Sequence, residues 1–221
     1  MPPPALIIFD LDGTLIDSAA DLAVAINAML AGYGREPLPV AEVRRMVGDG
    51  VATLVARALA ARHCEPPDPA AAERSFMRHY ESNATSLTTV FPGAEPALQA
   101  LSAAGIPLAV CTNKPARIAI DILGSLGLIK YFARVIGGDS LPYRKPDPRV
   151  VLALLEAFAV GPEDSLLVGD SEVDAATARA AGVPFVLMKH GYRRGPVEQM
   201  QCRAALENFA ELPALVGVPL R

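Results

Sequence analysis

The sequence has few of the residues that mark disulfide-rich or membrane-spanning proteins. It contains no tryptophan and only three cysteines, which lie far apart at Cys64, Cys111 and Cys202. An odd number of cysteines without a Cys-x-x-Cys pair argues against a disulfide framework or a zinc site, and is typical of a reducing compartment. No apolar run approaches the roughly 20 residues that cross a bilayer. The N-terminus also lacks the basic segment of a signal peptide and reaches Asp10 too soon.

The charge balance excludes a further class of protein. The chain has 20 basic and 24 acidic side chains, a formal net charge of −4. A non-specific nucleic-acid binder needs an excess of basic residues. Hydrophobic residues make up 52% of the 221 positions and charged residues 20%, which is a globular rather than a disordered composition. We therefore expect a cytoplasmic protein with neither a membrane nor a nucleic-acid partner.

Short apolar runs alternate with helical patterns over most of the chain. Runs that are apolar on both faces are typical of parallel strands covered by helices on either side. The repeated strand–helix unit predicts a doubly wound, Rossmann-like α/β sheet with right-handed crossovers. The expected strands are 5–9, 106–111, 134–136, 165–168 and 184–188, and the clearest helical patterns between them are 116–126, 148–158 and 172–181.

One stretch interrupts this alternation. From about residue 17 to residue 86 there is no strand signal, and apolar stripes at helical spacing recur instead. Ser18-Ala-Ala-Asp21 has the form of a capping box that would open the first of these helices. We expect a helical cap domain of residues 17–86, inserted into a core domain formed by residues 1–16 and 87–221.

Polar side chains follow the expected strands where each one ends. In an open α/β sheet, ligands bind outside the carboxyl ends of the strands, so these segments should converge on one crevice. Each also has a purely structural interpretation, such as an Asp-Gly turn, an N-cap or a solvated lysine. The residues are Asp10 and Asp12, Thr112 and Asn113, Lys145, and Asp170 and Asp174.

The carboxylates in this set predict a cation site if they meet. Two like charges 4 Å apart repel by roughly 4 kcal/mol at an effective dielectric near 20. A cluster that offers only oxygen ligands suits Mg²⁺, which binds one or two carboxylates together with water and a substrate phosphate.

Four segments, in this order along the chain, resemble the motifs of the haloacid dehalogenase superfamily. They are Asp10-Leu-Asp-Gly-Thr14, Thr112-Asn113, Lys145-Pro146 and Gly169-Asp-Ser-x-x-Asp174. The phosphatase branch of that superfamily has two aspartates in the first motif, as here, and the resemblance covers essentially the whole chain. Finer features, such as Val47-Gly-Asp-Gly50 and Cys111-Thr-Asn-Lys-Pro115, resemble the bacterial phosphatases that hydrolyse 2-phosphoglycolate.

The resemblance implies a Mg²⁺-dependent phosphomonoester hydrolase that acts through an aspartyl-phosphate. Asp10 would be the nucleophile, and Asp12 would serve as general acid and then as general base. The metal would be held by the Asp10 carboxylate, the main-chain carbonyl of Asp12 and the Asp170 carboxylate, and Asp174 would either hold a metal-bound water or orient the groups around the ligands.

The same resemblance assigns the phosphoryl group and the leaving group to different parts of the chain. Thr112, the Asn113 backbone and Lys145 would bind the phosphoryl oxygens. The cap would close over the crevice, with Gly48, Asp49 and Gly50 as its substrate-facing loop.

Several alternatives stay open on the sequence. A dehalogenase would not need Asp12, but a phosphoryl-transferring mutase shares all four motifs. Other small phosphates, among them sugar and amino-sugar phosphates, pyrophosphate and nucleotides, are further candidate substrates, and a non-catalytic phosphate sensor is a candidate from another class. The expected partner is a small phosphorylated metabolite, and the sequence is compatible with a monomer or a homodimer.

Overall fold

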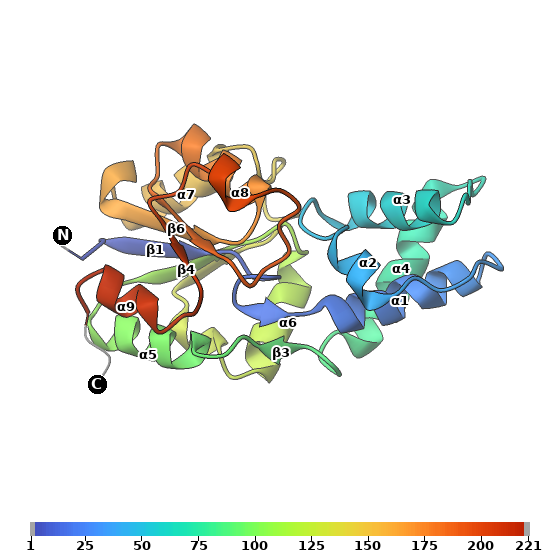
Figure 1. The fold of residues 1–221 in the computed structure, drawn as a ribbon, viewed down its shortest axis with the longest axis horizontal. Helices are drawn as coiled ribbons and strands as arrows, with labels where there is room; N and C mark the ends of the chain where they lie inside the picture. Colours follow the sequence, from blue (N-terminus) through green and yellow to red (C-terminus); the bar gives the residue numbers. More distant parts are fainter. Residues whose placement is uncertain (1–2, 219–221) are drawn as a thin grey trace.

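A six-stranded parallel sheet lies at the centre of the larger part of the molecule (Figure 1). The computed structural model describes residues 3–218. The strands are β1 (Leu6–Phe9), β4 (Leu108–Cys111), β5 (Arg134–Ile136), β6 (Ser165–Gly169), β7 (Phe185–Met188) and β8 (Ala204–Leu206). Their order is β5-β4-β1-β6-β7-β8, and every neighbouring pair is parallel. The strand order reverses at β1, so the predicted doubly wound sheet is confirmed.

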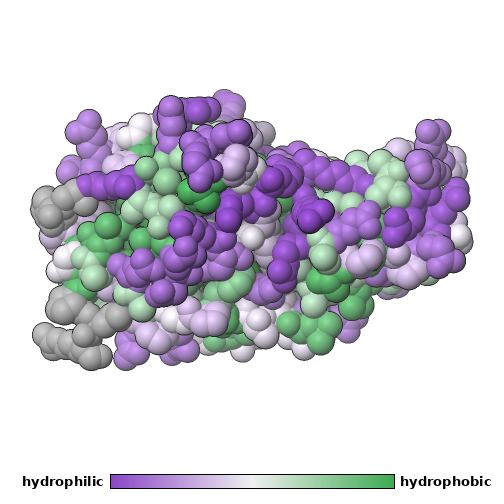
Figure 2. All heavy atoms as spheres, in the orientation of Figure 1, coloured by the Kyte–Doolittle hydropathy of each residue, from purple (hydrophilic) through white to green (hydrophobic). Residues whose placement is uncertain are grey.

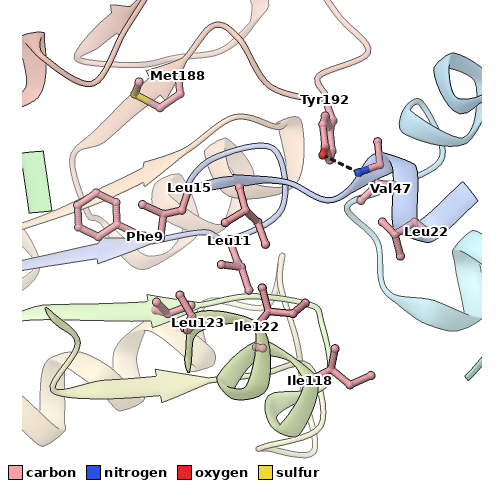
Figure 3. Close-up of a cluster of buried hydrophobic side chains, with 14 of the residues drawn as sticks. Phe9, Leu11, Leu15, Leu22, Val47, Ile118, Ile122, Leu123, Met188 and Tyr192 are labelled. Atoms are coloured by element: carbon pink, nitrogen blue, oxygen red, sulfur yellow. Dashed lines mark hydrogen bonds between the residues drawn. The ribbon is translucent and has the colours of Figure 1, made fainter. Parts of the chain in front are cut away.

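Both faces of the sheet are buried, as the apolar runs predict. In β1, Ile7 and Phe9 belong to one hydrophobic cluster, whereas Leu6 and Ile8 belong to the cluster on the opposite face. Successive side chains of a strand point to opposite faces, so each face of β1 packs against its own layer. Figure 3 shows Leu11 and Leu15, which follow β1, beside Phe9 and facing the side chains of one covering helix.

Helices cover both faces of the sheet (Figure 1). One layer contains α5 (Ala94–Ala103), α6 (Ala116–Ser125) and the short α9 (Glu211–Leu215). The other contains α7 (Arg149–Phe158) and α8 (Glu172–Ala181). Short 3-10 helices occur at η1 (Ile129–Tyr131), η2 (Pro162–Asp164) and η3 (Val197–Gln199).

Four helices form a separate body beside the carboxyl ends of the strands, which we call the cap. They are α1 (Ala19–Ala31), α2 (Val40–Arg44), α3 (Val51–Ala61) and α4 (Pro69–Asn83). The chain enters the cap through β2 (Ile16–Asp17) and leaves it through β3 (Thr89–Val90), which pair as a short antiparallel ribbon. The expected domain limits at 16/17 and 86/87 fall in or next to this ribbon, and the division stays a prediction.

The apolar interior of the cap is continuous with the hydrophobic cluster on one face of the sheet. Phe76 and Tyr80 of α4 are fully buried, and their rings stack with centroids 5.5 Å apart. Leu22 and Met29 of α1 and Leu59 of α3 pack in the same cluster. On the face shown in Figure 2, hydrophilic residues cover much of the surface, including the junction between the cap and the sheet.

Three details of the sequence interpretation are changed or completed by the structure. The capping box at Ser18 is wrong, because Ser18 makes no side-chain cap to α1 and the Asp21 carboxylate turns away to bind a distant segment. Strand β8 was not expected, since three residues at the edge of a sheet carry almost no apolar pattern. The three cysteines are free. In the described residues, no helix has both the length and the apolar character that a membrane crossing requires.

The side chain of Asp21 joins helix α1 to the segment by which the chain leaves the cap. Its carboxylate is 2% exposed and accepts hydrogen bonds from the backbone N–H groups of Leu87 and Thr88 and from the Thr88 hydroxyl. Asp21→Ala would leave the buried N–H of Thr88 without its acceptor, while the Thr88 hydroxyl would keep a second acceptor, the Ala84 carbonyl. We therefore expect the free energy of unfolding to fall by about 1–3 kcal/mol in urea denaturation. The exposed Asp121→Ala on α6 is the control, with a change below about 0.5 kcal/mol. Equal effects of the two substitutions would contradict this role.

Candidate active site

The first motif lies directly at the carboxyl end of the central strand. Asp10 follows β1 and is 7% exposed, and the Asp12 side chain is 12% exposed. The chain turns directly after Asp12, where Gly13 takes a φ of +85°, a region that favours glycine. A Cβ at Gly13 would also lie 2.4 Å from an Asp170 carboxylate oxygen. This glycine therefore permits both the turn and the close approach of the first and fourth motifs.

Lys145, in the third motif, lies next to Asp10. Its Nζ lies 2.8 Å from Asp10 Oδ1 and 2.6 Å from Asp174 Oδ1, and the residue is 3% exposed. Burial lowers the pKa of Lys145, but the charges of Asp10 and Asp174 outweigh burial and raise the pKa above its ordinary value. Lys145 is therefore a fixed buried cation rather than a solvated surface lysine.

The fourth motif places two carboxylates beside this lysine. Asp170 accepts a hydrogen bond from the Thr14 hydroxyl at 2.7 Å and another from the Tyr192 backbone N–H at 2.6 Å. Asp174 closes a capping box at the start of α8, where its Oδ2 accepts from the Ser171 hydroxyl at 2.6 Å. The capping box at the N-terminus of α8 thus holds the Asp174 side chain in an orientation that presents its other oxygen, Oδ1, to Lys145.

Three of these carboxylates form a cluster with an excess of negative charge. Oxygen atoms of Asp10, Asp170 and Asp174 all lie within 4.8 Å of one another, with all three residues buried. Burial, followed by repulsion from Asp174, raises the pKa of Asp10 to about 7 against the attraction of Lys145. Burial, followed by repulsion from Asp174 and Asp10, raises the pKa of Asp170 well above its usual range. One ammonium faces three carboxylates, so the cluster has the charge and the oxygen donors to hold a divalent cation.

The side chain of Asp12 lies outside this cluster. Its Oδ1 accepts a hydrogen bond from the Ser18 hydroxyl, and its Oδ2 lies 3.0 Å from Lys114 Nζ. The Lys114 ammonium also donates to the Tyr80 hydroxyl of α4 at 2.5 Å. Of the expected metal ligands, Asp12 could therefore contribute only its main-chain carbonyl, which is the atom that the resemblance implies. The separation leaves the two aspartates of the first motif in different surroundings.

Sequence reasoning missed the partners of Asp12. Lys114 directly follows Thr112-Asn113, and its place at a strand end was the available signal. Tyr80 and Ser18 had none, because a tyrosine in an apolar helical stripe and a serine before a helix are ordinary. Tyr192 was also missed as a link: its hydroxyl accepts from the Ser18 N–H at 2.9 Å, while its own N–H binds Asp170. Figure 3 shows this ring pointing from the sheet side toward the start of α1.

The second motif lies at the end of β4. Thr112 and Asn113 are 4% and 7% exposed. The Asn113 side-chain amide donates to the Lys145 carbonyl and to the Gly48 carbonyl, each at 3.0 Å. Asn113 thus supports the Lys145 loop and at the same time fastens the cap loop to the sheet.

The expected cap loop lies over these strand ends. Gly48 and Gly50 line a cavity between cap and sheet, but the Asp49 side chain points to the rim. There its Oδ2 lies 2.5 Å from Arg57 Nη1 and 2.9 Å from Arg194 Nη1. Burial favours a higher pKa for Asp49, yet hydrogen bonds from Arg194 and Arg57 hold the pKa below its usual value. Arg194 follows β7, so this ion pair is a second bond between the cap loop and the sheet.

The cavity itself measures about 40 Å³. Polar groups from the sheet form one side, and apolar side chains of the cap form the other. It is lined by Asp10, Asp12, Leu22, Val47, Gly48, Gly50, Val51, Leu54, Phe76, Tyr80, Thr112, Asn113, Lys114 and Pro115. The structure therefore brings the first and second motifs and the two cap glycines around one small space.

Known proteins resemble this chain over nearly all of its length. A phosphoglycolate phosphatase of Cereibacter sphaeroides is 46% identical over 212 residues, which are 95% of this chain and 96% of that protein. A phosphoglycolate phosphatase of Rhodospirillum rubrum is 46% identical over 222 residues, covering 98% and 92% of the two chains. The crystal structure of a predicted phosphoglycolate phosphatase from Haemophilus somnus superposes with a TM-score of 0.93 at 32% identity, covering 97% of this chain and 99% of that one.

The family-level comparison agrees with these relatives. The model of the haloacid dehalogenase-like hydrolases matches residues 7–188, which run from β1 to the end of β7 and include all four motifs. The order of the four motifs and the sheet topology agree with this match, and the chain belongs to the haloacid dehalogenase-like hydrolase family.

Proposed function

We propose that this hydrolase is a Mg²⁺-dependent phosphatase that converts 2-phosphoglycolate to glycolate and phosphate through an aspartyl-phosphate on Asp10. That it is a phosphatase enzyme follows from its family and from phosphatase relatives at 40–46% identity. The observation that carries the proposed mechanism is the position of Asp10. Its buried carboxylate lines the cavity together with Asp12 and lies 2.8 Å from Lys145 Nζ.

The proposed reaction has two displacements at phosphorus. An Asp10 oxygen attacks the phosphorus atom, and the bond from phosphorus to the ester oxygen breaks. Asp12 gives its proton to that leaving oxygen, so that glycolate departs with a neutral hydroxyl. Asp12 then accepts a proton from a water molecule, which attacks the phosphorus atom and releases phosphate from Asp10.

Residues of the sheet would hold the phosphoryl group in line with Asp10. Lys145 and the Thr112 hydroxyl are the donors proposed for its oxygens, together with the Asn113 backbone. The Asp10 and Asp170 carboxylates and the Asp12 main-chain carbonyl would bind Mg²⁺, and Asp174 would orient a metal-bound water. When bound, the metal would offset the negative charge of the phosphoryl group and of Asp10 as they approach each other.

The proposal is tested by phosphate release across a panel of esters. The panel contains 2-phosphoglycolate, sugar and amino-sugar phosphates, pyrophosphate and nucleotides, each assayed with Mg²⁺ and with EDTA. We expect 2-phosphoglycolate to have the highest kcat/KM, by at least about tenfold, and EDTA to reduce release to background because the carboxylate cluster then lacks its cation.

Other outcomes would replace parts of this proposal. A higher kcat/KM for another ester would retain the hydrolase and discard 2-phosphoglycolate. Full activity in EDTA would contradict the metal requirement. Conversion of one sugar phosphate to another without phosphate release would favour a mutase, and binding of phosphates without any turnover would favour a sensor.

A further inference from the structure

Lys114 is a buried cation that the mechanism above does not use. Its side chain is 2% exposed, and its Nζ contacts Asp12 Oδ2 at 3.0 Å and the Tyr80 hydroxyl at 2.5 Å. The Tyr80 ring also lies below this ammonium, with its centroid 4.7 Å from Nζ. Asp12 and Lys114 come from the sheet side and Tyr80 from the cap, so this cluster is assembled only where the two bodies meet.

The position of Lys114 is on the leaving-group side of the site. Among the described residues that line the cavity, Lys114 is the only one with a positive charge. Lys145 contacts Asp10 but does not line the cavity. Among residues 3–218, the ammonium has two polar partners. An ammonium has three N–H donors, so one stays available for a ligand in the cavity.

The short distance between Lys114 and Asp12 indicates which part of a substrate Lys114 would contact. In the proposed reaction Asp12 protonates the ester oxygen, so this oxygen lies within hydrogen-bond distance of the Asp12 carboxylate. Groups one or two bonds beyond the oxygen then come within reach of Lys114. In an ester of a 2-hydroxy acid, a carboxylate stands at this distance from the ester oxygen.

We infer that Lys114 binds the carboxylate of the leaving group and makes the site selective for phosphate esters of short 2-hydroxy acids. This inference rests on the proposed phosphatase reaction and names the residue that would choose its substrate class. A charge-assisted hydrogen bond in a buried site is stronger than a neutral one and discriminates against a substrate that lacks the charge. Tyr80 positions the ammonium from the cap, so selectivity depends on the cap lying over the sheet.

The rest of the cavity disfavours additional polar groups on the acid. Leu22, Val47, Leu54 and Phe76 line it with apolar side chains. Apolar walls offer no partner for additional hydroxyl groups, so a sugar would leave buried hydroxyls unpaired. A two- or three-carbon acid buries its methylene or methyl group there and places its single charge on Lys114.

The test compares two substrates that differ only in the charge of one group. They are 2-phosphoglycolate and the phosphate ester of glycolamide, in which a neutral amide replaces the carboxylate. For the wild-type protein and for Lys114→Met, the ratio of the two kcat/KM values is measured on one preparation, so it does not depend on the fraction of folded enzyme. We expect this ratio to fall by about 10- to 100-fold in Lys114→Met. Lys130→Met, which removes an exposed lysine on η1, is the matched control and should leave the ratio unchanged.

Separate outcomes test the inference and the proposed function. Equal losses on both substrates in Lys114→Met would mean that Lys114 acts only through Asp12, which overturns the inference while the phosphatase proposal stands. A wild-type protein inactive on 2-phosphoglycolate would instead overturn the proposed function. Should Lys114→Met yield no folded protein, inhibition of the wild type decides: glycolate should bind at least tenfold more tightly than glycolamide, and equal inhibition constants would refute the inference.

Discussion

Asp10→Asn should abolish phosphate release, by a factor of at least about 10⁴ in kcat, while the protein stays folded. The amide has nearly the shape of the carboxylate but is not a nucleophile, and no second carboxylate occupies its position at the end of β1. The assay is phosphate release from 2-phosphoglycolate with Mg²⁺, and circular dichroism reports the fold. The exposed Asp121→Asn serves as the control and should retain full activity.

The stability of this variant provides a second, independent readout. Burial and the Asp174 charge raise the pKa of Asp10 from 3.8 to about 7. A carboxyl group whose pKa is higher in the folded than in the unfolded protein reduces stability as the pH rises from about 4 toward and beyond 7. Asparagine carries no charge, so the metal-free variant should melt at the same temperature as the wild type or higher at pH 8. Residual activity above about 1% in a pure preparation, or a lower melting temperature, would contradict the position argued for Asp10.

Lys145→Met is expected to reduce kcat by about 10³-fold and to destabilise the metal-free protein by about 3–5 kcal/mol. Lys145 lies between Asp10 and Asp174 at 2.8 Å and 2.6 Å, with its side chain 1% exposed. Methionine fills the space, but it leaves neighbouring buried carboxylates without their compensating charge. Urea denaturation in EDTA measures this loss of stability.

Added metal should restore part of the lost stability. The variant and the wild type are compared again in saturating Mg²⁺, where a bound cation supplies positive charge to the same carboxylates and the difference between them should narrow. Lys130→Met on the surface is the matched control, with a change below about 0.5 kcal/mol. An unchanged free energy of unfolding for Lys145→Met in EDTA would show that the cluster does not depend on this lysine.

The fold class and most elements could be predicted because their signals are local. The run before Asp10 is apolar on both faces, and β1 does bury alternate side chains in two separate clusters. The small, alanine-rich pattern 172–181 corresponds to α8 at both limits. Polar residues at strand ends share one edge of a parallel sheet, which is why Asp10, Lys145, Asp170 and Asp174 could be expected to converge before their distances were known.

The type of sheet, the inserted helices and the residues that meet at the carboxyl ends of the strands follow from the amino-acid sequence. The partner of each of these residues depends instead on the tertiary packing. Asp12 pairs with Lys114 rather than joining the other carboxylates, and the Lys114 ammonium reaches Tyr80, 34 positions away in the cap. Asp21 likewise binds Thr88, 67 positions along the chain, instead of capping its own helix. Periodicity and spacing describe short-range geometry, whereas these contacts depend on how the cap packs against the sheet, and no local pattern encodes that packing.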